Sequence, residues 1–137
     1  SDGATNVLPI GDRDTIHRAW KLHVDHIRHS LVHAYYQGWD LHPAQLPTRY
    51  AAVYDFFLSG LKPATERLRN FMEKAGQATL VGDVFDDAAT GQGLLNYFIP
   101  GINSGALTED EALATGLTLD ELRSRSFVKI LAGRRGK

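Results

Sequence analysis

Residues 38–47, Gly-Trp-Asp-Leu-His-Pro-Ala-Gln-Leu-Pro, separate two long runs of helical spacing and contain two prolines that restrict the backbone. A residue that precedes proline is displaced from helical toward extended backbone angles, so His42 and Leu46 both favour an extended conformation. Pro47 itself suits the first turn of a helix, where its missing N–H has no partner to lose. The stretch therefore predicts a short strand, or the end of one, over residues 39–42 and a helix that begins at Pro47.

Helical spacing continues on both sides of this stretch. Before it, apolar residues recur at steps of three and four over residues 15–36, with Asp14 placed to cap the first turn and Gly38 to end the last. After it, the same spacing predicts one helix over residues 47–60 and another over residues 63–75, because Pro63 suits the start of a new helix.

The C-terminal half carries the sequence signs of three further helices. Asp86 and Asp87 mark the start of the first, and Pro100 breaks or kinks it. Capping boxes, in which a threonine and the glutamate three residues later satisfy free backbone N–H groups, mark the next two. They pair Thr108 with Glu111 and Thr118 with Glu121. Residues 78–85 fit either a strand or a loop, so the predicted fold class is mainly α with one to three short strands.

The composition is that of an ordinary globular protein and excludes several functional classes. The 137 residues are 43% apolar, and 15 basic side chains against 16 acidic ones give a net charge of -1. That balance argues against a nucleic-acid partner bound through bulk charge. No apolar run reaches the roughly 18 residues that span a bilayer. Without cysteine there is no disulfide or thiolate nucleophile. We expect a cytoplasmic protein with no nucleic-acid and no membrane partner.

Five of the six histidines fall on the first predicted helix. His26, His29 and His33 lie three and four residues apart on a face away from the apolar stripe, and such spacing lets imidazoles converge on one metal ion. No glutamate accompanies them in the pattern of a helical zinc motif, and neighbouring arginine and lysine side chains already make the face positive. The favoured interpretation, which includes His23, is a solvated or subunit-facing surface, and no metal ligand is assigned.

His42 is the centre of a second polar group. The side chains that accompany it are Trp39, Asp40, Gln45 and Arg49. Because α/β proteins bind ligands at the carboxyl ends of strands, these side chains are candidates for holding an anionic substrate. The alternative is a turn histidine bonded to nearby backbone beside a packed indole. The segment 2–6, with Asp2 and Asn6, is a second candidate loop, for which a disordered terminus is the alternative.

The run Gly-Trp-Asp-Leu-His-Pro-Ala-Gln at residues 38–45 resembles the Ile-His-Pro-x-Gln signature near the end of the citrate lyase β-subunit and HpcH/HpaI aldolase superfamily. With Tyr-Tyr-Gln at 35–37 and Leu-Pro-Thr-Arg-Tyr-Ala-Ala at 46–52, it is similar to an aldolase-like branch of that superfamily. The similarity continues from residues 1–6 through residues 125–130, so it covers nearly the whole chain.

The resemblance implies a place in a larger fold. Residues 1–61 would be the last two βα units of a TIM-type barrel, with residues 1–6 as the end of strand seven and residues 39–42 as strand eight. Residues 62–137 would be a helical C-terminal extension. In relatives this extension packs on a neighbouring subunit, so a homo-oligomer is expected. The helices predicted at residues 15–36 and 47–60 would be helices seven and eight of such a barrel. They would expose apolar side chains if their strands were missing. The side chains concerned are Ile16, Trp20, Val24, Tyr54 and Phe57.

Members of the superfamily make or cleave a carbon–carbon bond beside a carbonyl, through an enolate that Mg²⁺ stabilises. The resemblance therefore implies a lyase or aldolase whose substrate is a 2-oxo or hydroxy acid that gives a pyruvate-type enolate. His42 would be catalytic. The substrate-binding residues would be Asp2, Asn6, Trp39, Asp40, Gln45 and Arg49. The Mg²⁺ ligands, a Glu and an Asp on earlier strands, would precede Ser1, so this chain alone would not be competent.

Two further features of the sequence bear on this resemblance. Relatives that use coenzyme A carry a Gly-Lys pair just before the signature, whereas Gln37 and Gly38 stand there, which argues against an acyl-CoA substrate. The start at Ser1, without a methionine, agrees with a piece of a larger protein. The competing hypothesis is a self-standing helical protein-interaction module without catalysis, favoured by the high helical content and the incomplete site.

Overall fold

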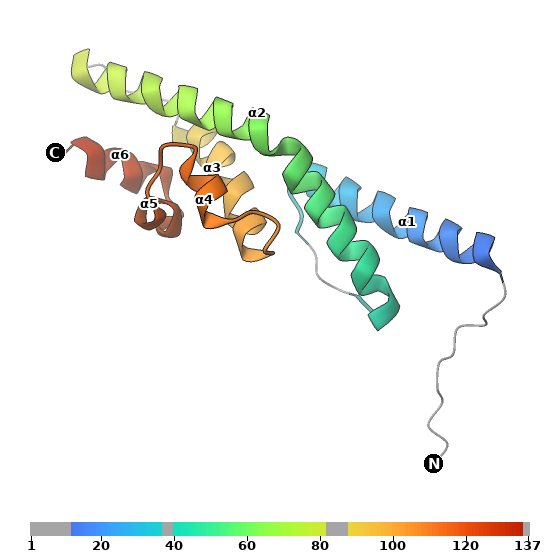
Figure 1. The fold of residues 1–137 in the computed structure, drawn as a ribbon. Helices are drawn as coiled ribbons and strands as arrows, with labels where there is room; N and C mark the ends of the chain where they lie inside the picture. The colour runs from blue at the N-terminus through green and yellow to red at the C-terminus, as the bar shows by residue number, and fades with distance from the viewer. Residues whose placement is uncertain (1–11, 37–39, 82–87, 136–137) are drawn as a thin grey trace. The chain divides into compact units, whose positions relative to one another are not determined.

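The computed structural model describes residues 12–36, 40–81 and 88–135, and these residues are mainly α-helical, as predicted (Figure 1). The helices are α1 (Arg13–Val32), the 3-10 turn η1 (Pro43–Gln45), α2 (Leu46–Val81), α3 (Ala88–Asn103), α4 (Glu109–Leu113), α5 (Leu119–Ser124) and α6 (Phe127–Arg135). The chain divides into two compact units, Ser1–Ala52 (unit 1) and Val53–Lys137 (unit 2). Within the described ranges, no helix is both long enough and apolar enough to span a bilayer.

Asp12, and not Asp14, caps the start of α1. Its carboxylate accepts hydrogen bonds from the backbone N–H groups of Asp14 at 3.2 Å and of Thr15 at 3.3 Å. The helix ends at Val32, well before the predicted end near Gly38. The reason is Ala34, which takes the left-handed conformation with φ of 63° and turns the chain out of the helix.

The predicted strand over residues 39–42 is not formed in its described part, which has no regular structure at Asp40 and a bend at the next two residues. His42 is extended, with φ of -147° and ψ of 140°, as the following proline requires. A strand, however, needs a second extended segment beside it, and the described residues contain no strand at all. The extended conformation predicted for Leu46 is wrong, because its φ of -58° and ψ of -47° are helical and α2 begins there.

The other two candidate strands have different outcomes. Residues 1–6 lie outside the described residues. Residues 78–81 belong to α2, while residues 82–85 lie outside the described ranges.

α2 runs without interruption through Pro63, so the predicted break between two helices is wrong. Proline removes one backbone N–H and normally disrupts a helix interior. Here the apolar face is buried both before and after the proline, and that packing offsets the lost hydrogen bond. The buried side chains of this face are Val53, Phe57, Leu68, Met72 and Ala75. The domain boundary expected between residues 61 and 62 falls inside this helix and stays a prediction.

The core of unit 2 contains three phenylalanines with almost no exposed surface, Phe57 on α2, Phe98 on α3 and Phe127 on α6. Phe57 was expected to be uncovered, and it is instead 2% exposed, because α3 packs on it. Phe127 approaches α3 closely at Gly91, where a Cβ would lie 2.4 Å from the ring. The absence of a side chain at this glycine therefore allows α6 to dock.

The predicted capping boxes are both present at the starts of α4 and α5. In each box the glutamate Oε2 accepts a hydrogen bond of 2.8 Å from the backbone N–H of the threonine. These pairs are Thr108 with Glu111 and Thr118 with Glu121. Pro100 lies inside α3, which continues to Asn103.

Candidate functional site

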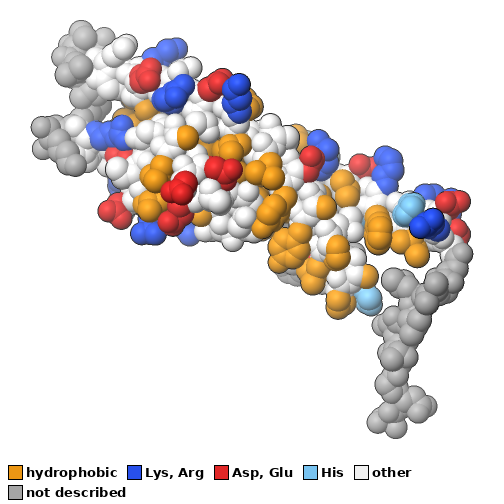
Figure 2. Space-filling view, viewed as in Figure 1, with side chains coloured by type: hydrophobic (Ala, Val, Ile, Leu, Met, Phe, Trp, Pro, Cys, Tyr) orange, Lys and Arg blue, Asp and Glu red, His pale blue; other side chains and the backbone are white. Residues whose placement is uncertain are grey.

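A pocket of about 540 Å³ lies within unit 1, between the first half of α1 and the corner where η1 meets α2. Most of its surface is apolar, with Ile16, Ala19 and Trp20 contributed by α1. Trp20 is 49% exposed, and Figure 2 shows apolar side chains, in orange, uncovered over α1 and the start of α2. A mostly apolar hollow with a few polar groups is typical of a ligand site.

The ring of His42 lines this pocket in a defined orientation. Its Nδ1 accepts a hydrogen bond of 3.1 Å from the backbone N–H of Ala44. Gln45 completes the cap, because its Oε1 accepts hydrogen bonds from the backbone N–H groups of Leu41 at 2.8 Å and of His42 at 3.1 Å. Since Nδ1 is an acceptor, the neutral ring carries its proton on Nε2. The neutral ring of His42, a residue that lines the pocket, thus has its one hydrogen-bond donor at Nε2.

Asp40, which is not a lining residue of the pocket, contacts side chains of both α1 and α2. Its side chain is only 6% exposed, and its Oδ2 accepts a hydrogen bond of 2.6 Å from Arg49 Nε. Its Oδ1 lies 3.3 Å from His23 Nε2, close enough for an ion pair, although the angles do not make a hydrogen bond. Both atoms are buried, and neither has a hydrogen-bond partner among the described residues.

The structure brings together part of the predicted site. His42 and Gln45 line the pocket, whereas Asp40 and Arg49 are not among its lining residues. The acid and the arginine contact each other, and Asp40 also reaches the pocket-lining His23. The remaining predicted residues, Asp2, Asn6 and Trp39, lie outside the described residues.

The sequence interpretation missed His23, which it grouped with the other histidines of the first helix. A signal was present: His23 lies three residues after Trp20 and four before the buried Ile27, which places it on the apolar stripe. A buried polar side chain on such a stripe is expected to lie beside another polar group, and His23 lies 3.3 Å from Asp40.

The remaining histidine face is exposed, as predicted for His26, His29 and His33. The rings of His29 and His33 lie 4.2 Å apart between centroids, and His33 Nδ1 donates to the His29 carbonyl at 2.7 Å. In the described part of the chain, no three acidic or histidine side chains converge as metal ligands would.

Comparison with known proteins shows the family of this chain. A family model described as "Domain of unknown function (DUF6986)" matches residues 1–130. The chain belongs to this family. The DUF6986 match includes the His42 pocket of unit 1 and the core of unit 2, so both are parts of one family domain. No curated protein and no solved structure matches the chain.

Proposed function

We propose that this DUF6986 chain is the closing part of a cytoplasmic, homo-oligomeric, Mg²⁺-dependent lyase or aldolase, which makes or cleaves a carbon–carbon bond of a 2-oxo or hydroxy acid. The observation that carries the proposal is the orientation of His42. Its Nδ1 is occupied by the backbone of its own turn, which leaves Nε2–H as the ring donor in the pocket that it lines.

The donor role fits the chemistry of an enolate. Negative charge develops on the substrate's carbonyl oxygen as the carbon–carbon bond breaks, and a positioned N–H stabilises that charge. In this proposal His42 donates from Nε2 to that oxygen and does not act as the base. Once barrel strands covered it, the apolar wall formed by Ile16, Ala19 and Trp20 would exclude water and so strengthen the same hydrogen bond.

The buried contacts of Asp40 support the position of His42. Asp40 precedes His42 by two residues and is bound to Arg49 on α2 and paired with His23 on α1. A segment tied to both helices keeps the His42 turn in one place. Catalytic groups need such support because small displacements reduce their effect strongly.

The described residues of unit 1 do not fit a Mg²⁺ site. Mg²⁺ takes oxygen ligands, usually one or two carboxylates with several waters. Asp40 already faces Arg49 and His23, and the carboxylate of Asp12 caps α1. The proposal therefore places the metal ligands outside this chain, and no step is assigned here to the ion.

The uncovered wall of the pocket supports the proposed place in a barrel. Trp20 is 49% exposed, and Ile16 and Val24 are only half-buried, although all three lie on the apolar stripe of α1. Burying such a stripe is the main source of stability for a surface helix. Strands of a βα barrel would cover it, and α1 and α2 would then be its last two helices.

A second candidate function is a helical interaction module without catalysis. The observation that favours it is the core of unit 2, in which the helices bury their own phenylalanines. The two candidate functions predict gene products of different lengths. A gene product no longer than this chain would contradict the lyase proposal and support the module.

The enzyme test uses the whole gene product and Mg²⁺-dependent release of pyruvate from 4-hydroxy-2-oxo acids. The informative variant is His42→Asn, because asparagine is a good capping residue that keeps an acceptor for the Ala44 N–H but lacks a donor at the position of Nε2. We expect kcat to fall by about a hundredfold. The control is His26→Asn on the exposed face of α1, which should keep full activity. Normal turnover of His42→Asn would exclude His42 from the site.

A further inference from the structure

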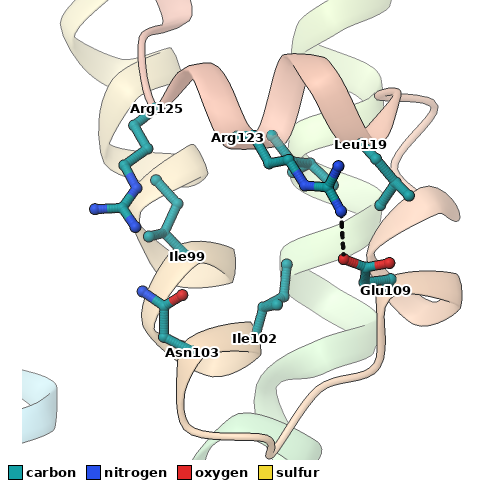
Figure 3. Close-up of a pocket in the computed structure, with 8 residues that line it drawn as sticks. Ile99, Ile102, Asn103, Glu109, Leu119, Arg123 and Arg125 are labelled. Carbon is teal, nitrogen blue, oxygen red and sulfur yellow. Dashed lines mark hydrogen bonds and ion pairs between the residues drawn. The ribbon is translucent and has the colours of Figure 1, made fainter.

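Unit 2 contains a second, smaller pocket of about 160 Å³, bounded by α3, α5 and the start of α4 (Figure 3). Its floor is apolar and consists of Ile99, Ile102, Leu119 and Leu122. Figure 3 shows Arg123 turned toward Glu109 on one side, and Arg125 and Asn103 together on the other. The pocket thus has an apolar base and two polar sides of different character.

The two arginines differ in their electrostatic surroundings. Arg123 Nη2 lies 3.1 Å from Glu109 Oε1, so its charge is paired. The guanidinium of Arg125 makes no hydrogen bond or ion pair with any other described residue, and the same is true of the Asn103 amide. With Glu109 offsetting Arg123, the pocket retains one positive charge, located at Arg125. That charge is complementary to a monoanion.

The backbone at Arg125 is unusual. It ends α5 in the left-handed conformation, with φ of 53° and ψ of 19°. Glycine is the favoured residue at this position of a helix end, because a Cβ makes the conformation costly. Gln92 holds the backbone there, since its Nε2 donates to the Arg125 carbonyl at 3.2 Å and its Oε1 accepts from Phe127 N–H at 2.9 Å. A strained residue that also carries a cation at a pocket is a reason to infer a function.

We propose that this pocket binds a small monocarboxylic acid with a short aliphatic chain. The carboxylate lies against the guanidinium of Arg125 and the amide of Asn103, and the chain lies on the isoleucine and leucine floor. The volume sets the size, since 160 Å³ is roughly five times the share of one water molecule in the liquid. An acid with a few carbon atoms fits this volume, and a longer ligand would extend out of the half-open pocket.

The first experiment titrates the 137-residue chain with isovalerate and follows amide chemical shifts by NMR. We expect saturable shifts at α3 and α5. Isovaleramide, which keeps the shape but not the charge, and acetate, which keeps the charge but not the chain, should each bind about tenfold more weakly. Absent saturation, or equal binding of the amide, would overturn the proposal.

A further titration distinguishes a free acid from the C-terminus of a protein as the ligand of this pocket. A tripeptide that ends in leucine presents the same carboxylate and aliphatic group, with a chain attached. We expect it to bind more weakly than isovalerate because the pocket is small. Tighter binding of the tripeptide would overturn the assignment to a free acid.

The second experiment distinguishes a ligand-binding role of Arg125 from a structural role. Arg125→Gly removes the guanidinium and also relieves the left-handed conformation, so we expect binding to fall by about tenfold or more while the thermal midpoint rises. Arg69→Gln, an exposed arginine of α2 outside this pocket, is the control and should bind like the wild type. Wild-type affinity in Arg125→Gly would show that this arginine binds no ligand and would end the proposal.

Discussion

Arg49 Nε donates a hydrogen bond of 2.6 Å to Asp40 Oδ2, and these side chains are only 14% and 6% exposed. Asp40→Ala removes the carboxylate and leaves the nearly buried guanidinium without this partner, so we expect the free energy of unfolding to fall by about 3 kcal/mol. Denaturant unfolding followed by circular dichroism measures it. Lys21→Ala, which breaks the exposed Lys21–Asp25 pair, should cost less than about 0.5 kcal/mol. Similar losses in both variants would contradict the buried pairing.

Tyr97 should make stability depend on alkaline pH. Burial raises the pKa of Tyr97 from 10.0 to about 12, and its hydroxyl donates a hydrogen bond of 2.5 Å to the Phe57 carbonyl. Because the folded-state pKa is the higher one, the stabilisation is complete below pH 10 and is lost as the pH rises toward 12. Unfolding midpoints across this range test it. Tyr97→Phe should lose the hydrogen bond and, with it, this part of the pH dependence.

Glu121 should make stability depend on acidic pH. Hydrogen bonds from Arg134 lower the pKa of Glu121 below 4.5, with Nε at 2.6 Å from Oε1 and Nη2 at 2.8 Å from Oε2. A lowered folded-state pKa stabilises the protein above pH 4.5, and this contribution disappears as the pH falls further. Arg134→Gln removes the cause and should reduce the slope of stability against pH. An unchanged slope in this variant would show that the arginine does not set the acid response.

Two glycines of α3 should respond to alanine with opposite signs. At Gly91 a Cβ would lie 2.4 Å from the buried Phe127 ring, so Gly91→Ala should cost about 2 kcal/mol through overpacking. At Gly93 nothing lies within 4 Å, so Gly93→Ala should stabilise the helix by about 0.5 kcal/mol or more. Thermal unfolding of both variants is the measurement, and a loss in Gly93→Ala would contradict this account of α3.

The features that the sequence predicted correctly depend on residues close together in the chain. The capping boxes at Thr108 and Thr118 need only a glutamate three residues later, and both are formed. The extended backbone of His42 follows from the next residue, Pro43. These features require no knowledge of which helices meet.

The features that sequence patterns missed depend on distant contacts. Pro63 has the local signature of a helix start, yet the buried face shared by Phe57 and Leu68 keeps α2 continuous. His23 and Asp40 lie seventeen positions apart, and their pairing follows from the approach of α1 to the segment after it. Propensity is a weak guide where such packing decides the outcome.

Gln92 uses one side-chain amide to bind the backbone on both sides of the break between α5 and α6. Its oxygen accepts from Phe127 N–H, and its nitrogen donates to the Arg125 carbonyl and to Asn96 Oδ1. Glutamate lacks the donor, methionine lacks both groups, and asparagine is one carbon shorter. Of the twenty coded amino acids, glutamine alone combines this reach with this pair of groups. We therefore expect every substitution at this codon to lower the thermal midpoint, even though the side chain is not fully buried.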